Sequence, residues 1–485
     1  MGLTRKVAFN TAAQFVGKIA TTLLSLILVA ALTRYLGVSG FGQYTTIFAY
    51  MSLFAVLADF GFFWIFVREI AKPNIDLNKT ASNILTMRFF AGLSVFFIGA
   101  VLSLIIPQYQ EIRTGIFIAA LANLFLTLNS TFIGIFQNKL RMDKAVYTDI
   151  IGRVVILVVS LLLIKSNMGL NTILWAYALG NLLNLMASAL LGRKYFTFRP
   201  QFDFRYWAKI WWEILPMGIV LVLNLIYFRI DTLMLSLLKG PADVGIYGPP
   251  YKILEILIYF PSMFVGNIFP IIAGFIYSKD PRLESTLQKA LDFLFLSAVP
   301  LVVSFIFLSP LAIKWVAGQE FVHASTINPI FNLPATSVTA LQILMVAVGF
   351  SFISHLFNYL IIALGKQIKL ILPNLILVIV NIVLNLILIP RFSYLGAAFT
   401  TVLTEALVLL FAWWVAKRYL DFNLQYKNFI RVSLTGLAMI GAIFFLQLIL
   451  PVLLSVVLGV IIYLGLLYLI GGIRKELVLA IFEKR

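Results

Sequence analysis

The chain has 485 residues, 62% of them hydrophobic, and a mean hydropathy of +1.02. A soluble protein of this composition could not cover its surface with polar groups, so the soluble globular class is excluded. The net charge of +18 would suit a nucleic-acid-binding protein, but most basic residues lie in gaps between long apolar stretches, so no nucleic acid is expected as a partner.

Fourteen apolar stretches of near membrane-spanning length follow one another along the chain. A helix needs about 20 apolar residues to cross the hydrocarbon core, so each stretch predicts one transmembrane helix. The first is too long for a signal-peptide core and is expected to stay as the first helix. The predicted spans are about 8–32, 43–67, 81–106, 114–136, 146–164, 169–191, 210–237, 246–276, 288–308, 337–363, 370–389, 394–416, 429–449 and 452–473. The predicted fold class is an all-α polytopic membrane protein.

The basic residues alternate between the gaps. Of 37 Lys and Arg residues, 26 lie in the N-terminus, the even-numbered gaps and the C-terminal tail, and six lie in the odd-numbered gaps. Basic loops stay in the cytoplasm, so both termini are expected there, in a multi-pass protein of the cell (inner or plasma) membrane. The basic excess is a topology signal and also favours contact with anionic lipid of the bilayer.

The longest inward gap divides the first twelve spans into two sets of six. The predicted organisation is an N-lobe at 1–191, a cytoplasmic inter-lobe linker at 192–209, a C-lobe at 210–418, and two peripheral helices with a cytoplasmic tail at 419–485. Residues 432–473 contain no charged residue, so the last two helices are expected to face lipid.

A short internal repeat supports this division. The pattern Gly-x4-Gly-x-Tyr runs from Gly37 to Tyr44 and again from Gly240 to Tyr247. Glycine suits a tight turn that needs unusual backbone angles. An even number of spans separates the copies, which predicts a parallel repeat about an axis along the membrane normal. Transporters built from such repeats often bind their substrate between the two halves.

Several predicted spans carry polar stripes at helical spacing. The stripe of the first span comprises Asn10, Gln14, Lys18, Thr21 and Ser25. Side chains of this kind either bond between packed helices or line an aqueous cavity. Stripes in both halves of the chain favour a shared cavity.

Ionisable residues deep in the spans are the sharper signal, because each costs at least about 2.5 kcal/mol at the bilayer centre. Lys252 and Glu255 are three residues apart and can pair, whereas Arg229 and Asp231 are two apart and cannot face the same way. Such sets form either structural ion pairs or a cationic site for an anionic headgroup, which Arg binds bidentately and Lys binds as a compact charge. The deep ionisable residues are Lys18, Asp59, Arg88, Arg229, Asp231, Lys252, Glu255, Asp292 and Glu405; Arg153 and Glu213 lie nearer the inner interface.

These residues resemble the polysaccharide-transporter branch of the multidrug/oligosaccharidyl-lipid/polysaccharide flippase superfamily, which includes O-antigen flippases. The resemblance covers nearly the whole chain. It rests on Arg34-Tyr35-Leu36-Gly37 with Gly42 and Tyr44, Asp59-Phe60-Gly61 before Arg68-Glu69-Ile70, Arg229-Ile230-Asp231 before Gly245-Ile246-Tyr247, and Gly318-Gln319-Glu320-Phe321.

The resemblance implies two six-helix lobes around a cationic cavity. It implies a flippase that moves polyprenyl-(di)phosphate-linked oligosaccharide to the outer leaflet by alternating access for cell-surface polysaccharide biosynthesis, with polysaccharide assembly proteins as further candidate partners. Lys18, Arg88, Arg229 and Lys252 would then bind the (di)phosphate. The acidic residues that would balance this charge or bind a coupling ion are Asp59, Asp231, Glu255 and Glu405.

Two other functions compete with this hypothesis. A multidrug exporter of the same superfamily would use Asp59 and Glu405, but four deep cations would repel a cationic drug. A glycan polymerase or ligase would need larger outer loops, and Glu320 with His323 is no catalytic signature. The chain has no cysteine, only two histidines, and no Gly-x4-Gly-Lys-Ser/Thr loop, so no metal, cofactor or built-in ATPase is expected. Na⁺, H⁺ or the membrane potential would supply the energy.

Overall fold

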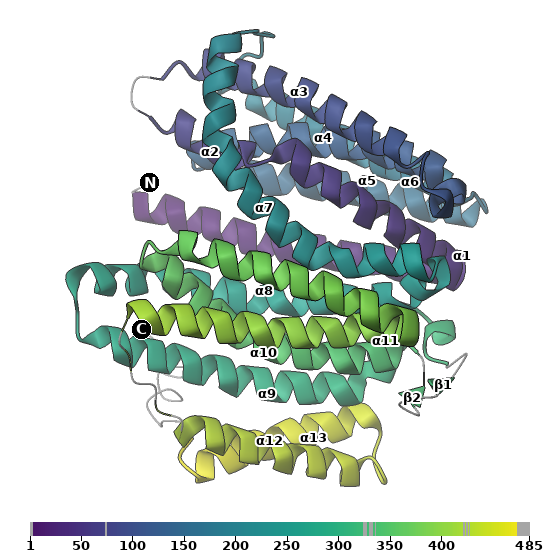
Figure 1. The fold of residues 1–485 in the computed structure, drawn as a ribbon, viewed down its shortest axis with the longest axis vertical. Helices are drawn as coiled ribbons and strands as arrows, with labels where there is room; N and C mark the ends of the chain where they lie inside the picture. The colour runs from purple at the N-terminus through teal and green to yellow at the C-terminus, as the bar shows by residue number, and fades with distance from the viewer. Residues whose placement is uncertain are drawn as a thin grey trace. The chain divides into compact units, whose positions relative to one another are not determined.

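The computed structural model describes residues 3–72, 75–323, 327–328, 333–334, 336–420, 422, 425 and 427–472. Within these residues the fold is almost entirely helical (Figure 1). The long helices are α1 (Leu3–Asp59), α2 (Phe62–Ile70), α3 (Leu77–Leu102), α4 (Arg113–Asn138), α5 (Met142–Lys165), α6 (Leu170–Gly192), α7 (Phe204–Leu238), α8 (Pro241–Ser278), α9 (Arg282–Val316), α10 (Ser337–Ala363), α11 (Ile371–Tyr419), α12 (Lys427–Leu446) and α13 (Val452–Leu469). Short 3₁₀ turns span Pro107–Ile112, Gln319–Phe321 and Gln367–Leu370, and β1 (Ile327–Asn328) pairs antiparallel with β2 (Leu333–Pro334).

Two of the helices are double-length and broken in the middle. A straight helix of 57 residues, the length of α1, would be about 85 Å long, far more than a bilayer core needs. Gly37 interrupts α1 with φ 65° and ψ −174°, and Ser393 interrupts α11 with φ 51° and ψ −134°. Twelve candidate membrane spans occur among the described residues. Because two of these spans are doubled in this way, the predicted all-α polytopic fold with about fourteen segments is confirmed.

The second predicted span, 43–67, is interrupted. The helix α1 ends at Asp59, and Phe60 and Gly61 both have positive φ (36° and 91°) before α2 begins. Glycine adopts this conformation without a steric penalty. A Cβ built at Gly61 would lie 3.2 Å from the side chain of Met217 on α7, so the turn also brings the two segments close together. The break places Asp59 at the end of α1, where its side chain is partly exposed.

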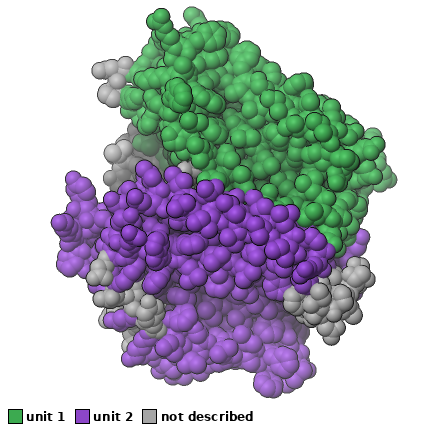
Figure 2. All heavy atoms as spheres, viewed as in Figure 1, with its two compact units in different colours: residues 1–248, 316–318 green, residues 249–315, 319–485 purple. Residues whose placement is uncertain are grey.

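The described chain forms two compact units, shown in different colours in Figure 2. Unit 1 comprises 1–248 and 316–318, and unit 2 comprises 249–315 and 319–485. The helix α7 groups with unit 1 because it packs on α1 and α2, with the Phe60 ring stacked on Trp211 and Arg68 paired with Glu213. This grouping differs from the lobe boundary expected at 192–209. The division into lobes stays a prediction from the repeat.

The two copies of the glycine repeat pack against each other inside unit 1. Gly37 and Gly240 both have positive φ, so the first glycine of each copy makes the expected turn. The second glycine does something different, because it permits close backbone approach. A Cβ at Gly245 would lie 2.0 Å from the carbonyl oxygen of Val38, and one at Gly42 would lie 1.6 Å from a backbone oxygen. Neither position has room for a side chain.

Unit 1 has a continuous apolar core from α1 to α7, fixed by a few polar contacts. The Tyr50 hydroxyl donates to the carbonyl oxygen of Gly99 at 2.8 Å, which joins α1 to α3. The Tyr109 hydroxyl lies 3.0 Å from Ser236 Oγ at the end of α7. Buried hydroxyls need such partners, so each contact fixes the register of one helix on another.

Candidate functional site

Arg88 on α3 is buried in unit 1 and has no exposed surface. Its guanidinium pairs with Asp59 of α1 and donates to Ser130 and, at 3.2 Å, to Thr131 on α4. A buried Arg needs such a partner because an uncompensated charge in the interior is costly. The cluster therefore joins three helices, α1, α3 and α4. Arg88 presents no atom to a ligand in this conformation, while the Asp59 side chain is 28% exposed.

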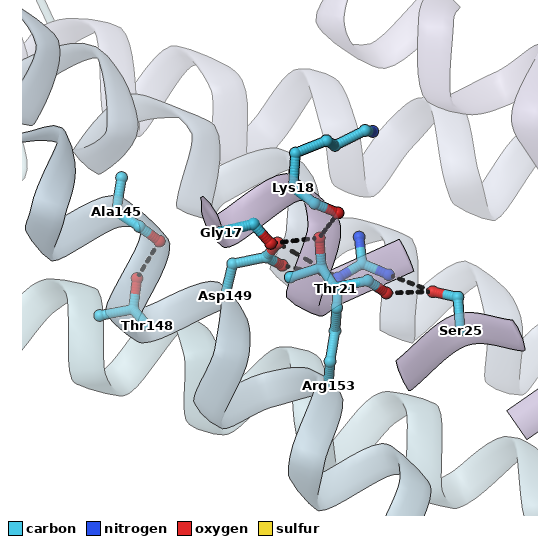
Figure 3. Close-up of polar contacts among 8 residues, drawn as sticks. All are labelled: Gly17, Lys18, Thr21, Ser25, Ala145, Thr148, Asp149 and Arg153. Carbon is cyan, nitrogen blue, oxygen red and sulfur yellow. Dashed lines mark hydrogen bonds and ion pairs between the residues drawn. The ribbon is translucent and has the colours of Figure 1, made fainter. Parts of the chain in front are cut away.

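A second polar cluster joins α1 to α5 (Figure 3). Arg153 Nε lies 3.2 Å from both carboxylate oxygens of Asp149, one turn earlier on α5. Its Nη1 donates to Ser25 Oγ on α1 at 3.0 Å, and Ser25 in turn donates to the Thr21 carbonyl at 2.9 Å. The Arg153 side chain is 42% exposed. It therefore combines a fixed orientation with an open face, which a site for an anionic oxygen requires.

Lys18 lies on α1 one turn before Thr21, next to this cluster. Its side chain is exposed on α1 and points away from Arg153 and Asp149 in Figure 3. Its backbone carbonyl accepts a hydrogen bond from Thr21 Oγ1 at 3.2 Å. The ammonium group thus lies apart from the Arg153 guanidinium.

The two predicted site residues of α7 differ in environment. Asp231 is buried and Arg229 is partly exposed. This agrees with the expectation that two residues two positions apart face different ways on a helix.

Unit 2 holds the other three predicted residues. Lys252 Nζ lies 3.0 Å from Glu255 Oε2, so the predicted pair on α8 is confirmed. Glu405 is buried on the second half of α11. Beside it along the helix, Thr404 Oγ1 accepts a hydrogen bond from Asn381 Nδ2 at 3.5 Å across the break at Ser393. Asn385 donates to Asn381 Oδ1 at 2.9 Å within the first half of α11.

The structure thus distributes the eight predicted residues over both units. Asp59 and Arg88 contact each other, as do Lys252 and Glu255. Sequence reasoning placed Arg153 near the inner interface and did not select it. Two sequence features could have selected Arg153: Asp149 four residues earlier on the same helix, and the polar stripe on α1 that contains Ser25. In the part of the chain that the structure describes, no three His, Asp or Glu side chains gather as a metal site would need.

Comparison with known proteins identifies the family. The family model described as "Polysaccharide biosynthesis protein" matches residues 7–275, more than half of the chain. The chain belongs to the polysaccharide biosynthesis protein family. The resemblance to the flippase superfamily is therefore confirmed, and so is the prediction of a multi-pass membrane transporter rather than an enzyme.

Individual relatives of this family member agree with that placement. The Haloferax volcanii protein named "Probable low-salt glycan biosynthesis flippase Agl15" is 20% identical over 437 residues, which cover 89% of this chain and 88% of the relative. The structure titled "Lipid II flippase MurJ, inward closed conformation" has a TM-score of 0.76 at 16% identity and covers 95% of this chain and 98% of its own. An inward-facing MATE multidrug transporter of the MOP superfamily has a TM-score of 0.61 at 13% identity, covering 84% and 95%. At these identities the solved structures show a shared fold.

Proposed function

We propose that this member of the polysaccharide biosynthesis family flips a polyprenyl-(di)phosphate-linked oligosaccharide from the cytoplasmic to the outer leaflet by alternating access. The observation that carries the proposal is the open guanidinium of Arg153 in unit 1, oriented by Asp149 and Ser25. Its Nη2 makes no hydrogen bond to any residue that the structure describes. Arg binds phosphate oxygens through such free donors.

The eight predicted residues take unequal parts in this proposal. Lys18, Arg229 and Lys252 are at least partly exposed and would add positive charge for the (di)phosphate. Arg88 is enclosed, so its contribution is to hold α1, α3 and α4 together unless the unit rearranges. The acidic residues Asp231 and Glu405 would bind a coupling ion, Na⁺ or H⁺, or balance the charge; Asp59 and Glu255 neutralise Arg88 and Lys252. Both chain ends are proposed to lie in the cytoplasm.

The direct test is transport in proteoliposomes. The purified protein would be reconstituted, and flipping of a fluorescent polyprenyl-diphosphate sugar would be measured by its accessibility to an external quencher. Arg153→Gln and Arg229→Gln remove proposed headgroup contacts, and Arg282→Gln is the matched control because Arg282 pairs with Asp280 at an exposed turn between helices.

We expect flipping to fall at least tenfold in Arg153→Gln and Arg229→Gln, since a lost charge-assisted hydrogen bond costs about 1.5–3 kcal/mol. The control should keep the parent rate. Unchanged flipping in both variants would contradict the assignment of Arg153 and Arg229 to a headgroup site. No flipping by the parent, with efflux of a cationic dye instead, would favour a multidrug exporter.

A further inference from the structure

The segment that joins α6 to α7, together with the first turns of α7, has an unusual composition. Residues 193–212, here called the strap, read RKYFTFRPQFDFRYWAKIWW. The strap contains nine aromatic residues, five basic residues and a single acid, Asp203. Trp and Tyr concentrate at membrane–water interfaces, and Lys and Arg concentrate on the cytoplasmic side. The strap combines both signals in one stretch.

The strap is tied to α3 along an extended run of backbone. Every second backbone N–H from 197 to 203 donates to a polar side chain of α3, at 2.8–3.3 Å. This period of two is that of an extended strand. The four pairs are Thr197 with Asn78, Arg199 with Ser82, Gln201 with Thr86 and Asp203 with Asn83. Because the backbone is held in this way, the strap is a fixed surface of unit 1 beside the beginning of α3 (Figure 1).

Large aromatic side chains of the strap remain uncovered. Phe204 is 69% exposed and Trp212 is 70% exposed, and Phe198 and Phe202 are also exposed. Rings this large are costly to leave in water, and they favour the boundary between headgroups and acyl chains. The positive-inside rule assigns this end of the molecule to the cytoplasm, so the boundary concerned is that of the inner leaflet.

The basic side chains of the strap are also exposed to solvent. None of its five basic side chains forms an ion pair with any residue that the structure describes, and all five residues are exposed. Asp203 accepts a hydrogen bond from the Tyr206 backbone N–H at 3.0 Å, as the cap of α7. An open hollow of about 650 Å³ is lined by residues 201–205, including Arg205. Positive charge and exposed rings side by side match the charge and layering of an anionic lipid surface.

We propose that the strap binds anionic phospholipid headgroups of the cytoplasmic leaflet. Arg199, Arg205 and Lys209 attract the headgroups, and the exposed rings insert beside them. The hydrogen bonds to α3 transmit this anchoring to unit 1. The inference is independent of which molecule the protein transports.

The absence of cysteine in the chain allows a direct test. A donor dye is attached through Ala208→Cys, an exposed position in the strap, and the full-length protein is reconstituted in mixed phosphatidylglycerol and phosphatidylcholine vesicles. Energy transfer is then compared for acyl-chain-labelled acceptors of either lipid. The ratio of the two transfers measures enrichment of the anionic lipid around the strap.

The strap variant is Arg199→Gln/Arg205→Gln/Lys209→Gln. The matched control is Lys279→Gln/Lys289→Gln/Lys369→Gln, which removes the same charge from exposed lysines in other cytoplasmic gaps. Each basic residue near an anionic surface is worth at most about a fivefold increase in local lipid. We therefore expect several-fold enrichment in the parent and control, and a ratio close to one in the strap variant.

A second measurement needs no charge-removing variant: the enrichment of anionic lipid around the unmodified strap is measured again at a higher salt concentration. Screening at about 1 M salt shortens the Debye length to about 3 Å and should abolish the enrichment. The proposal is overturned by a ratio of one in the parent, by enrichment that resists salt, or by an equal loss in the control. A ratio of one together with saturable binding of an acidic peptide would assign the strap to a protein partner instead.

Discussion

Replacing Asp59 by leucine should destabilise unit 1 substantially. The substitution removes the carboxylate that pairs with Arg88 and leaves a fully buried guanidinium without a compensating charge. Breaking a buried pair in this way costs about 3–5 kcal/mol. Asp59 is partly exposed, so we expect a value near the lower end, about 3 kcal/mol. For a unit of this size that corresponds to a fall in Tm of roughly 5–10 °C.

The measurement is a double-mutant cycle on detergent-solubilised protein, followed by tryptophan fluorescence during heating. Asp59→Leu, Arg88→Met and the double variant are compared with the parent. The double variant should recover most of the loss, because an apolar pair of similar volume is often neutral. Ser130 keeps a partner in the double variant, since its hydroxyl also donates to the Thr127 carbonyl at 2.8 Å.

Asp149→Leu is the control for the loss of an accessible pair. Asp149 and Arg153 are both partly exposed, and exposed pairs one helical turn apart are worth only about 0.3–0.5 kcal/mol. Our reasoning about Arg88 is refuted if Asp59→Leu and Asp149→Leu shift Tm equally. Transport separates the two roles of Arg88. A stable double variant that still flips its substrate assigns Arg88 to structure, whereas a stable variant that has lost flipping assigns it to the headgroup.

Two further predictions concern packing in unit 1. Gly245→Ala places a methyl group 2.0 Å from the Val38 carbonyl oxygen and should cost about 1–3 kcal/mol, seen as a lower Tm. Gly274→Ala on the same helix has nothing within 4 Å and should be neutral or slightly stabilising; equal effects of the two would disprove the close approach. Tyr109→Phe should lower stability by about 1 kcal/mol by removing the contact with Ser236. In a Ser236→Ala background, Tyr109→Phe should lower the free energy of unfolding clearly less. An equal loss of stability in both backgrounds would show that the two hydroxyls are not coupled.

Properties that depend on one helix at a time could be predicted from the sequence. The spans follow from apolar length alone, because every backbone polar group in the hydrocarbon must be satisfied within a helix. The Lys252–Glu255 pair follows from the three-residue spacing on one helix. The different environments of Arg229 and Asp231 follow from the same helical geometry.

Contacts between helices were decided only by the tertiary structure. Asp59, Arg88 and Ser130 lie on three helices, and their meeting depends on how each helix is rotated about its axis. The repeat glycines were expected to make turns, yet Gly245 serves close packing, which depends on where another segment crosses it. Arg153 gains its orientation from Ser25, 128 residues away. Hydropathy constrains the length and direction of a helix but leaves its rotation and neighbours open, since many packings bury equally apolar faces in lipid.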